Sequence, residues 1–254
     1  MVMGIIYNTP KIITDGLVLC LDGKNKRSYP GTGTAWNDIS EGFSNSLVSR
    51  KPAENATLVN GATFNSDGYI VFDGTNDYAS VGTNLDAQFT NEEVTVCAFA
   101  QIGADVSKNS LIAFFGSTGN NTFSWHAFFL PCYRLSGSAG NGVEQLFWNN
   151  TSGWEQGNAN TTDFDQDTWY FFSWTISGRT LKFYVNDGYD GSATLANSTN
   201  GKFNPRNNRV WIGRAASSGE YINGVIGNLL VYNRALEHQE IIDNFNATRK
   251  RYGV

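Results

Sequence analysis

Aromatic and polar side chains that could bind a sugar gather in the middle of the chain. Between residues 123 and 156, stretches rich in Gly, Ser and Asn separate tryptophan, tyrosine, arginine and glutamate residues. Sugars are held by the flat faces of aromatic rings together with hydrogen bonds from amides and carboxylates. We therefore expect a glycan-binding or interface surface in this segment. Its candidate residues are Trp125, Tyr133, Arg134, Glu144, Gln145, Trp148, Trp154 and Glu155.

The same residue types also fit a structural role, because a β-rich domain buries many aromatic rings. The aromatic run from Trp169 to Trp174 would make both faces of a strand apolar, and we interpret it as core. Trp148 and Trp154 are flanked by Asn and Gly. For these two residues, an exposed binding role and partial burial both remain open.

Carboxylates and histidines do not form a catalytic pattern. A glycosidase needs two carboxylates at the scissile bond, and no Glu-x-Asp-x-Glu sequence occurs. Asp163, Asp165 and Asp167 precede a strand in a turn-rich stretch, where solvated turn residues are the simpler interpretation. His126 and His238 have no spacing suited to a metal pair or a Ser-His-Asp arrangement. We predict no catalytic residue, no enzyme activity and no metal site.

The charge balance argues against nucleic-acid binding. With 23 acidic and 18 basic residues the formal net charge is −5, whereas a phosphate backbone is bound by clustered Lys and Arg. The basic cluster at 249–251 is interpreted as a solvated tail. No apolar run approaches the ~20 residues that span a bilayer, and the first residues lack the basic start of a secretory leader. We therefore predict neither a membrane segment nor a signal peptide.

Short apolar alternations separated by Gly, Asn, Asp and Ser predict an antiparallel β protein. With 254 residues, 41% of them hydrophobic, the chain can bury the core of one domain. Cys20, Cys97 and Cys132 form no C-x-x-C pair, and we expect Cys20 and Cys97 to act as small hydrophobes in strands. The expected strands cover residues 17–22, 69–72, 78–81, 94–101, 110–115, 123–130, 144–148, 169–176, 180–186, 210–213 and 226–232.

The C-terminal segment GVIGNLLVYNRALEHQEI (224–241) passes from a β alternation into a helix. From Leu236 onward, the apolar residues take helical spacing, so we expect one short helix that begins near Leu236. In the preceding strand, a period of two divides the residues between two faces. Ile226, Asn228, Leu230 and Tyr232 fall on one face, and Gly227, Leu229 and Val231 on the other.

This segment, with its pattern G-x-I-x-x-x-x-V-Y-N-R-A-L-x-x-x-E-I, resembles the end of laminin-G-like domains of the concanavalin A-like lectin/glucanase type. The stretch at 167–187 is similar to a hairpin of that family, and FDGTNDY at 72–78 fits its F-D-G-x-x-D-Y motif. The resemblance implies an all-β, concanavalin A-like jelly-roll sandwich of two antiparallel sheets with one short C-terminal helix. Such sandwiches carry many unrelated functions.

The segment DGLVLCLDGKNKRSYPGTGTAWNDIS (15–40) resembles laminin-G-like proteins encoded by bacteriophages, which carry G-L-V-L-x-L-D, S-Y-P-G-x-G and W-x-D-x-S in this order. We therefore divide the chain into an N-terminal arm, residues 1–14, and a jelly-roll domain, residues 15–254. The resemblance implies a non-enzymatic virion protein of the capsid or tail, assembled in the host cytoplasm. Its partners would be other virion proteins, its own copies and a cell-surface glycan.

Many laminin-G domains hold Ca²⁺ at the rim of the sandwich with two aspartates. The positions that match here are Asn149 or Asn150, after EQLFW, and Asn207 or Asn208, before RVWIGR. Neutral amides lack the charge that usually sets calcium affinity. Calcium at this position is therefore disfavoured, and no cofactor is expected.

Apolar residues outside the matched pattern suggest an assembly contact. Leu230 stands where the family's outward face usually carries a polar residue, so something must cover it. The arm offers Ile5, Ile6, Ile12 and Ile13, each worth roughly 1.5 to 3 kcal/mol when buried. We predict that the arm covers the domain's own sheet at Leu230 or docks on a neighbouring subunit. Two other functions stay open, a free carbohydrate-binding lectin and, third, a polysaccharide-cleaving enzyme.

Overall fold

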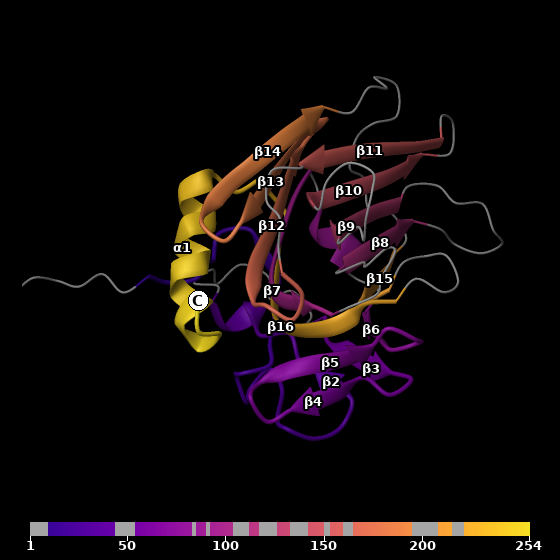
Figure 1. Ribbon diagram of the computed structural model, residues 1–254, viewed down its shortest axis with the longest axis vertical. Coiled ribbons are helices and arrows are strands. Elements are labelled where there is room, and N and C mark those ends of the chain that lie inside the picture. Colours follow the sequence, from indigo (N-terminus) through magenta and orange to yellow (C-terminus); the bar gives the residue numbers. More distant parts are fainter. Residues whose placement is uncertain are drawn as a thin grey trace, which may run out of the picture.

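The structure is a computed structural model of the chain. It describes residues 10–43, 54–82, 85–89, 92–103, 112–116, 126–132, 142–149, 153–159, 165–194, 208–214 and 221–254. Within these residues, two antiparallel sheets face each other and an α-helix lies against the outer side of the first sheet (Figure 1). The predicted all-β sandwich with a short C-terminal helix is confirmed.

The first sheet is organised around β16, which has β7 along one side. On its other side, the first residues of β16 pair with β5 and the later ones pair with β1 (Leu17–Asp22). The strand order is β14 (Gly188–Thr194), β13 (Thr180–Val185), β12 (Tyr170–Ser177), β7 (Glu93–Ile102), β16 (Asn223–Tyr232), β5 (Tyr69–Asp73) and β4 (Thr63–Asn65).

In the second sheet, four strands that follow one another in sequence form a meander, and β15 returns to lie between this meander and β6. The order is β11 (Gly153–Ala159), β10 (Gly142–Asn149), β9 (His126–Cys132), β8 (Ile112–Gly116), β15 (Asn208–Ile212), β6 (Tyr78–Val81), β3 (Ala56–Val59) and β2 (Ala35–Trp36). Three short 3-10 turns complete the described elements, at Ser40–Phe43, Leu85–Gln88 and Arg249–Arg251.

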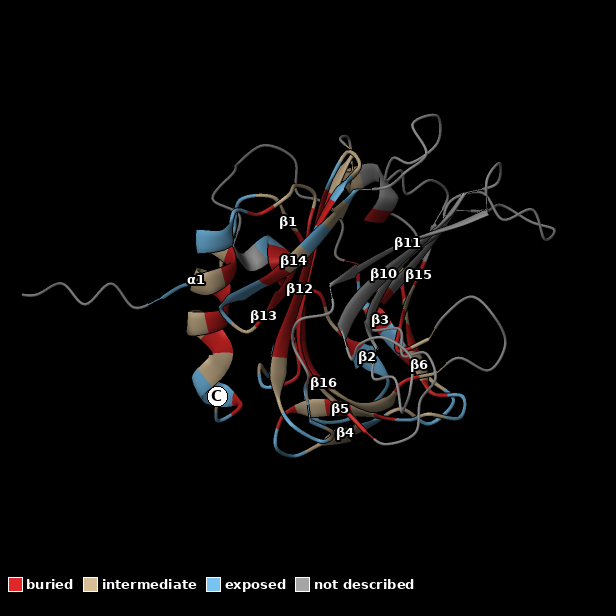
Figure 2. Ribbon diagram, turned by 45° about the horizontal axis from the view of Figure 1, so that its top comes forward, coloured by how far each residue is buried: buried red, intermediate tan, exposed pale blue. Residues whose placement is uncertain are grey.

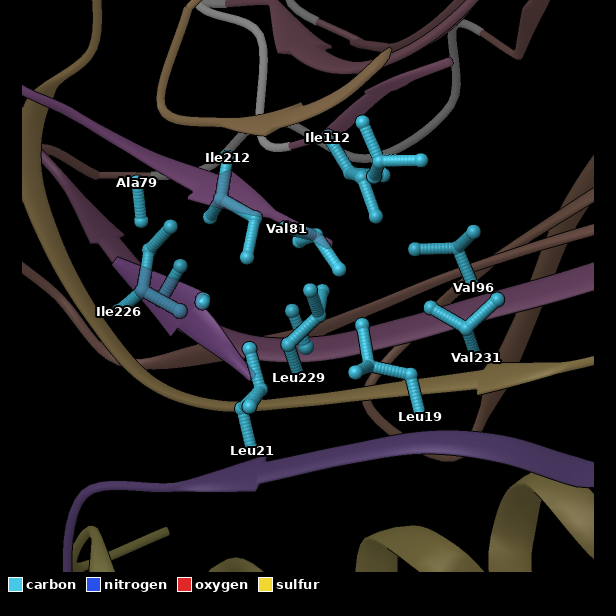
Figure 3. Close-up of a cluster of buried hydrophobic side chains, with 14 of the residues drawn as sticks. Leu19, Leu21, Ala79, Val81, Val96, Ile112, Ile212, Ile226, Leu229 and Val231 are labelled. Carbon is cyan, nitrogen blue, oxygen red and sulfur yellow. The ribbon is translucent and has the colours of Figure 1, made fainter. Parts of the chain in front are cut away.

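The inner faces of the two sheets meet in an apolar core (Figure 3). Leu229 and Val231 of β16 are fully buried against side chains of the opposite sheet such as Ile212. In the strands whose burial is described, alternate residues face this core, and Figure 2 shows buried residues along β12 of the first sheet. Burial of each such side chain contributes roughly 1.5 to 3 kcal/mol.

A second apolar cluster covers the outer side of the first sheet, beneath α1 (His238–Thr248) (Figure 1). Ile241 and Phe245 of the helix pack there with Leu230, which is completely buried. Cys20 and Cys97 are also buried in this cluster, and burial raises the pKa of both thiols, that of Cys97 to about 12. Both cysteines therefore behave as the small hydrophobes that their positions suggested.

Two polar contacts fix the start of α1 and the C-terminal end of the chain. Arg234 donates two hydrogen bonds to the carboxylate of Glu240, at 2.8 and 2.6 Å, and Glu240 accepts the backbone N–H of Glu237 at 2.9 Å. At the other end, Arg251 forms an ion pair with the buried Asp22. The basic cluster at 249–251 is thus not wholly a solvated tail, because Arg251 is tied to the first sheet.

One prediction about β16 is wrong. Ile226 was expected on the same face as Leu230, but Ile226 lies in the core between the sheets while Leu230 lies beneath α1. The pairing of β16 with β7 shifts between Ile226 and Asn228, which is a β-bulge. A bulge inserts one extra residue, so the two-residue alternation changes face at this point.

Candidate functional site

The described residues of the expected sugar-binding segment lie on neighbouring strands of the second sheet. Trp148 of β10 is the cross-strand partner of Trp154 on β11 and of His126 on β9. Glu144 is the partner of Leu130 and Glu155 that of Phe147. The structure therefore brings the positions of Trp148 and Trp154 together. Trp125, Tyr133 and Arg134 lie outside the described residues.

This pairing continues across the sheet as one row of residues. His126 is paired with Phe115 of β8, and Phe115 with Arg209 of β15. The row thus runs from Trp154 to Arg209 over five strands that Figure 1 shows side by side. Residues in one row of a sheet are spaced about 4.5 to 5.5 Å apart, so the row brings together positions far apart in sequence.

A group of three aromatic rings surrounds an arginine where β15 ends, and we call it the Arg214 cluster: Tyr78, Trp211, Arg214 and Tyr221. The guanidinium carbon lies 3.9 Å from the centre of the Trp211 ring, 4.8 Å from that of Tyr78 and 5.2 Å from that of Tyr221. Tyr78 and Trp211 also meet edge to face, with ring centres 6.0 Å apart. All four residues are half-buried.

The backbone around Gly213 explains why these four residues meet. Gly213 has φ +83°, a left-handed conformation that glycine adopts without strain. A Cβ there would lie 3.0 Å from both Ile222 and Phe72, so the chain passes close to the core before it turns outward. Ile222 donates its N–H to the Gly213 carbonyl oxygen at 2.8 Å, and a β-bridge joins Arg214 to Tyr221.

The Arg214 cluster and the row of Trp148 and Trp154 belong to the same sheet. Trp211 lies two residues beyond Arg209, which is the last member of the row. Within its own row, Trp211 is paired with Ala113 of β8 on one side and with Ser80 of β6 on the other. The second sheet therefore carries a cation held by rings at β15 and β6 and, beyond β8 and β9, the positions of two further tryptophans on β10 and β11.

A family model of the concanavalin A-like lectin/glucanases superfamily, of the laminin-G type, matches residues 73–242, which include the whole Arg214 cluster and six of the eight strands of the second sheet. The chain belongs to this lectin/glucanase superfamily. The laminin-G-like resemblance found in the sequence is therefore confirmed, and the phage-encoded type stays a prediction. No match is found among curated proteins.

Solved structures share the fold of this lectin/glucanase domain at low sequence identity. Trypanosoma rangeli sialidase, in complex with sialic acid, matches with a TM-score of 0.59 and 17% identity over 93% of this chain and 33% of that chain. The binding domain of botulinum neurotoxin serotype D matches with a TM-score of 0.60 and 13% identity over 92% of this chain and 52% of that chain. The domain thus spans between a third and about half of these chains.

These neighbours correct one prediction. The sequence was interpreted as that of a non-enzymatic protein, but the fold of this lectin/glucanase domain occurs within chains of sialidases, which are glycosidases. The prediction that the chain is not an enzyme is therefore wrong. At these low identities the likeness concerns the fold, so the sialidase reaction is not transferred to this chain.

The residues weighed for catalysis and metal binding are dispersed. Asp165 and Asp167 are exposed before β12, and Asp163 lies outside the described residues. His238 begins α1, where its Nε2 lies 2.9 Å from the carbonyl oxygen of Asp187. His126 is the first residue of β9. Over the described part of the chain, no three His, Cys, Asp or Glu residues form a group that could hold a metal ion.

The asparagines at the family's calcium position lie at the same end of the second sheet. Asn149 ends β10 and Asn208 begins β15, each one residue beyond the row of Trp148 and Arg209. Asn150 and Asn207 lie outside the described residues. That calcium is disfavoured here stays a prediction.

The apolar residues assigned to assembly are found partly beneath α1. Leu230 is covered by the chain's own helix, and Ile12 and Ile13 pack against the same cluster. Ile5 and Ile6 lie outside the described residues. Homo-oligomer formation, capsid or tail partners and location in a virion stay predictions. None of the helices in the described ranges is long and apolar enough to cross a bilayer.

The sequence interpretation did not identify the Arg214 cluster as a site. Trp211 and Arg214 occur in RVWIGR, and Tyr78 ends the F-D-G-x-x-D-Y motif. A signal was present, because Trp211 stands between the core residues Val210 and Ile212 and so had to point to the other face of its strand. The contacts of Arg214 with Tyr78 and Tyr221 could be predicted only with knowledge of the strand order in the second sheet.

Proposed function

We propose that this lectin/glucanase domain binds carbohydrate through the second sheet, at the Arg214 cluster. The observation that carries the proposal is the grouping of three half-buried rings around one guanidinium, within 3.9 to 5.2 Å of its carbon. Aromatic rings offer apolar faces to the C–H groups of a sugar, while tyrosine hydroxyls can form hydrogen bonds with its hydroxyls.

The row of Trp148 and Trp154 supports the same surface. It places two more aromatic residues on strands that continue the sheet beyond β15 and β8. A sugar chain longer than one residue needs such an extended surface, because each ring accommodates about one sugar unit. The neighbours that share the fold include a sialidase solved with sialic acid, which is consistent with a sugar-binding use of this architecture.

A glycan array with the isolated chain tests the proposal. The variant Trp211→Ala removes the ring closest to Arg214, and we expect at least a tenfold loss of affinity for the best-bound glycan. Tyr189→Ala is the matched control, because Tyr189 is an aromatic residue of the first sheet that is 52% exposed. Thermal melting of both variants, compared with the parent, verifies that each one is folded.

Two outcomes would contradict the proposal. One is a folded parent chain that binds no glycan on the array. The other is glycan binding that Trp211→Ala leaves unchanged. The same preparation incubated with the bound glycan, followed by detection of released sugar, tests hydrolysis separately from binding.

A further inference from the structure

Basic residues from two distant parts of the chain meet beside the C-terminal end of α1. One group follows β1 in the sequence GKNKR (23–27), and the other is the 3-10 turn Arg249–Arg251. The buried carboxylate of Asp22 joins them, because it accepts the backbone N–H of Lys24 at 3.0 Å and forms an ion pair with Arg251. Lys24 in turn donates a hydrogen bond to the backbone carbonyl oxygen of Arg251. We call this group the Arg251 cluster: Lys24, Lys26, Arg27, Arg249, Lys250 and Arg251.

The Arg251 cluster is positive although the chain as a whole is not. Six of the 18 Lys and Arg residues lie in it, whereas the net charge of the chain is −5. The exposed members are Lys24, Lys26, Arg27, Lys250 and Arg251. Asp67 is an exposed acid beside Gly68, against which Lys24 packs, and it offsets one of these charges. Because exposed charges interact over only about 8 Å at physiological ionic strength, acidic residues elsewhere do not cancel the remaining positive field.

A line of three aromatic rings begins at the same cluster. The ammonium nitrogen of Lys24 lies 5.0 Å from the centre of the Tyr252 ring. Tyr252 packs on Trp169 with ring centres 4.6 Å apart, and Trp169 meets Tyr69 edge to face at 5.6 Å. Tyr252 is buried, while Trp169 and Tyr69 are half-buried. The cations of the Arg251 cluster therefore lie directly beside a partly accessible aromatic surface.

Rings beside cations match a polysaccharide that carries acid groups. A half-buried ring can cover the C–H face of a sugar, and an exposed cation can pair with a carboxylate or a sulfate. A lipid surface would also require exposed apolar side chains, but among the described residues the exposed large hydrophobic one is Tyr189, on β14. The net charge of −5 disfavours a nucleic acid, whose phosphates are densely spaced.

We propose that the Arg251 cluster, with Trp169 and Tyr69, binds an anionic polysaccharide on the outer side of the first sheet. This inference goes beyond the proposed function, because it adds a separate surface on the sheet opposite the Arg214 cluster and names its ligand class. Carboxylates and sulfates share the negative charge and the oxygen acceptors that these cations recognise, so both kinds of polymer enter the test.

The ligand side of the test compares each charged polymer with its neutral counterpart on the parent chain. Polygalacturonate is paired with its methyl ester, and dextran sulfate is paired with dextran. We expect at least one charged polymer to bind about tenfold more tightly than its counterpart, and the pair that shows the difference identifies the acid group. Raising NaCl from about 50 mM to about 500 mM should weaken this binding, because exposed ion pairs are screened. Equal binding of charged and neutral polymers would overturn the inference.

The protein side uses two double variants. Lys26→Gln with Lys250→Gln removes one exposed cation from each segment of the cluster. Lys11→Gln with Lys182→Gln is the matched control, because both lysines are exposed, lie outside the cluster and change the net charge equally. We expect the first double variant to lose about tenfold in affinity for the charged polymer, since two exposed ion pairs of modest strength are removed. The control should match the parent, and an equal loss in both double variants would overturn the inference.

A third variant tests the rings. Tyr69→Ala should weaken binding of the charged polysaccharide and leave binding of inorganic polyphosphate, which has no sugar ring, unchanged. Equal effects on the two polymers, or no effect on either, would overturn the assignment to a polysaccharide. Thermal melting of every variant, compared with the parent, verifies that it is folded.

Trp211→Ala separates this inference from the proposed function. If the charged polymer loses affinity for Trp211→Ala but not for the Lys26→Gln and Lys250→Gln variant, the second sheet binds it, which overturns the inference and supports the proposed function. Tighter binding of phosphatidylserine vesicles or of single-stranded DNA than of either charged polysaccharide would overturn the ligand class. If the double variant fails to fold, the comparison of charged and neutral polymers on the parent chain still decides the matter.

Discussion

Two adjacent residues of β16 perform different tasks at its bulge. Asn228 is buried, and its side-chain oxygen accepts the backbone N–H of Phe99 at 2.8 Å, which satisfies a strand donor where the ladder is interrupted. Gly227 lies beneath the ring of Tyr252, so the C-terminal residues can close over the first sheet. The alternation predicted from the sequence assumed an unbroken register between β16 and its neighbours. A bulge of this kind cannot be predicted from the pattern of apolar residues.

Replacement of Gly227 by alanine should loosen the C-terminal closure. The added Cβ would lie 2.3 Å from Cε1 of Tyr252, much closer than such atoms approach, and Tyr252 packs against Phe99 at 4.5 Å between ring centres. We expect Gly227→Ala to lower the free energy of unfolding by about 1 to 3 kcal/mol, measured by urea titration. Gly188→Ala, where the new Cβ meets its nearest atom at 3.4 Å, is the control. Equal stability of both variants would refute the close packing at Gly227.

At the scale of elements, strands with a clear alternation could be predicted and weakly patterned ones could not. The bounds expected for β1 and β6 agree with the structure, and α1 begins two residues after the expected Leu236. β11 and β14 were missed because Gly and polar residues interrupt their apolar pattern. β2 and β4 are too short, at two and three residues, to show a period. β3 follows a short Ala-Thr-Leu-Val alternation that was not recognised.

The ion pair at the start of α1 should make stability depend on pH. Hydrogen bonds from Arg234 hold the pKa of Glu240 below its usual value in the folded protein. The ionised Glu240 carboxylate therefore contributes to the free energy of unfolding at pH values above its unfolded pKa of ~4.3. This contribution is lost as the pH falls through the folded pKa. We expect Glu240→Gln to reduce the free energy of unfolding by about 1 kcal/mol at pH 7.

The difference between Glu240→Gln and the parent should shrink below about pH 4, where the carboxylate of the parent is itself protonated. Chemical unfolding at several pH values measures this difference in the free energy of unfolding. Asp243→Asn changes the same charge on the same helix, at a carboxylate that accepts a hydrogen bond from Gln239, and should show a smaller loss at pH 7. A loss for Glu240→Gln that is constant from pH 7 to pH 3 would contradict this role of the ion pair.

At the scale of the whole molecule, the pairing of strands that are distant in sequence determines which residues meet at the candidate site. The sequence predicted an aromatic surface around Trp148 and Trp154, and the register of β10 and β11 places these positions opposite each other. It did not predict the Arg214 cluster, whose members come from β6, from β15 and the residues just after it, and from a position two residues before β16. Contacts between strands so distant in sequence depend on the sheet order, which composition and periodicity do not specify.

The N-terminal arm should stabilise the folded domain. Ile13 donates its N–H to Asn244 of α1 at 2.9 Å and accepts the Tyr232 hydroxyl at 3.0 Å, while Ile12 packs on the same cluster. Deletion of residues 1–14 should lower the free energy of unfolding by about 2 kcal/mol, because half-buried isoleucines contribute less than the ~3 kcal/mol of full burial. Deletion of residues 1–9 is the control, since it keeps Ile12 and Ile13.

Urea titration of both truncated chains measures this difference, and light scattering of the same samples tests whether the arm also supports self-association. Equal stability of the two truncated chains would show that Ile12 and Ile13 do not anchor the arm. A shorter chain that stays folded but loses self-association would support the predicted assembly role.

Affinity of the isolated chain for its best-bound glycan, measured by titration calorimetry with the parent, Trp211→Ala and Tyr189→Ala, tests the central claim most directly. If the second sheet binds sugar through the Arg214 cluster, the parent and Tyr189→Ala should bind alike and Trp211→Ala should bind at least tenfold more weakly. If Trp211→Ala binds like the parent while Tyr189→Ala loses affinity, the sugar is bound on the first sheet and the assignment of the Arg214 cluster is contradicted.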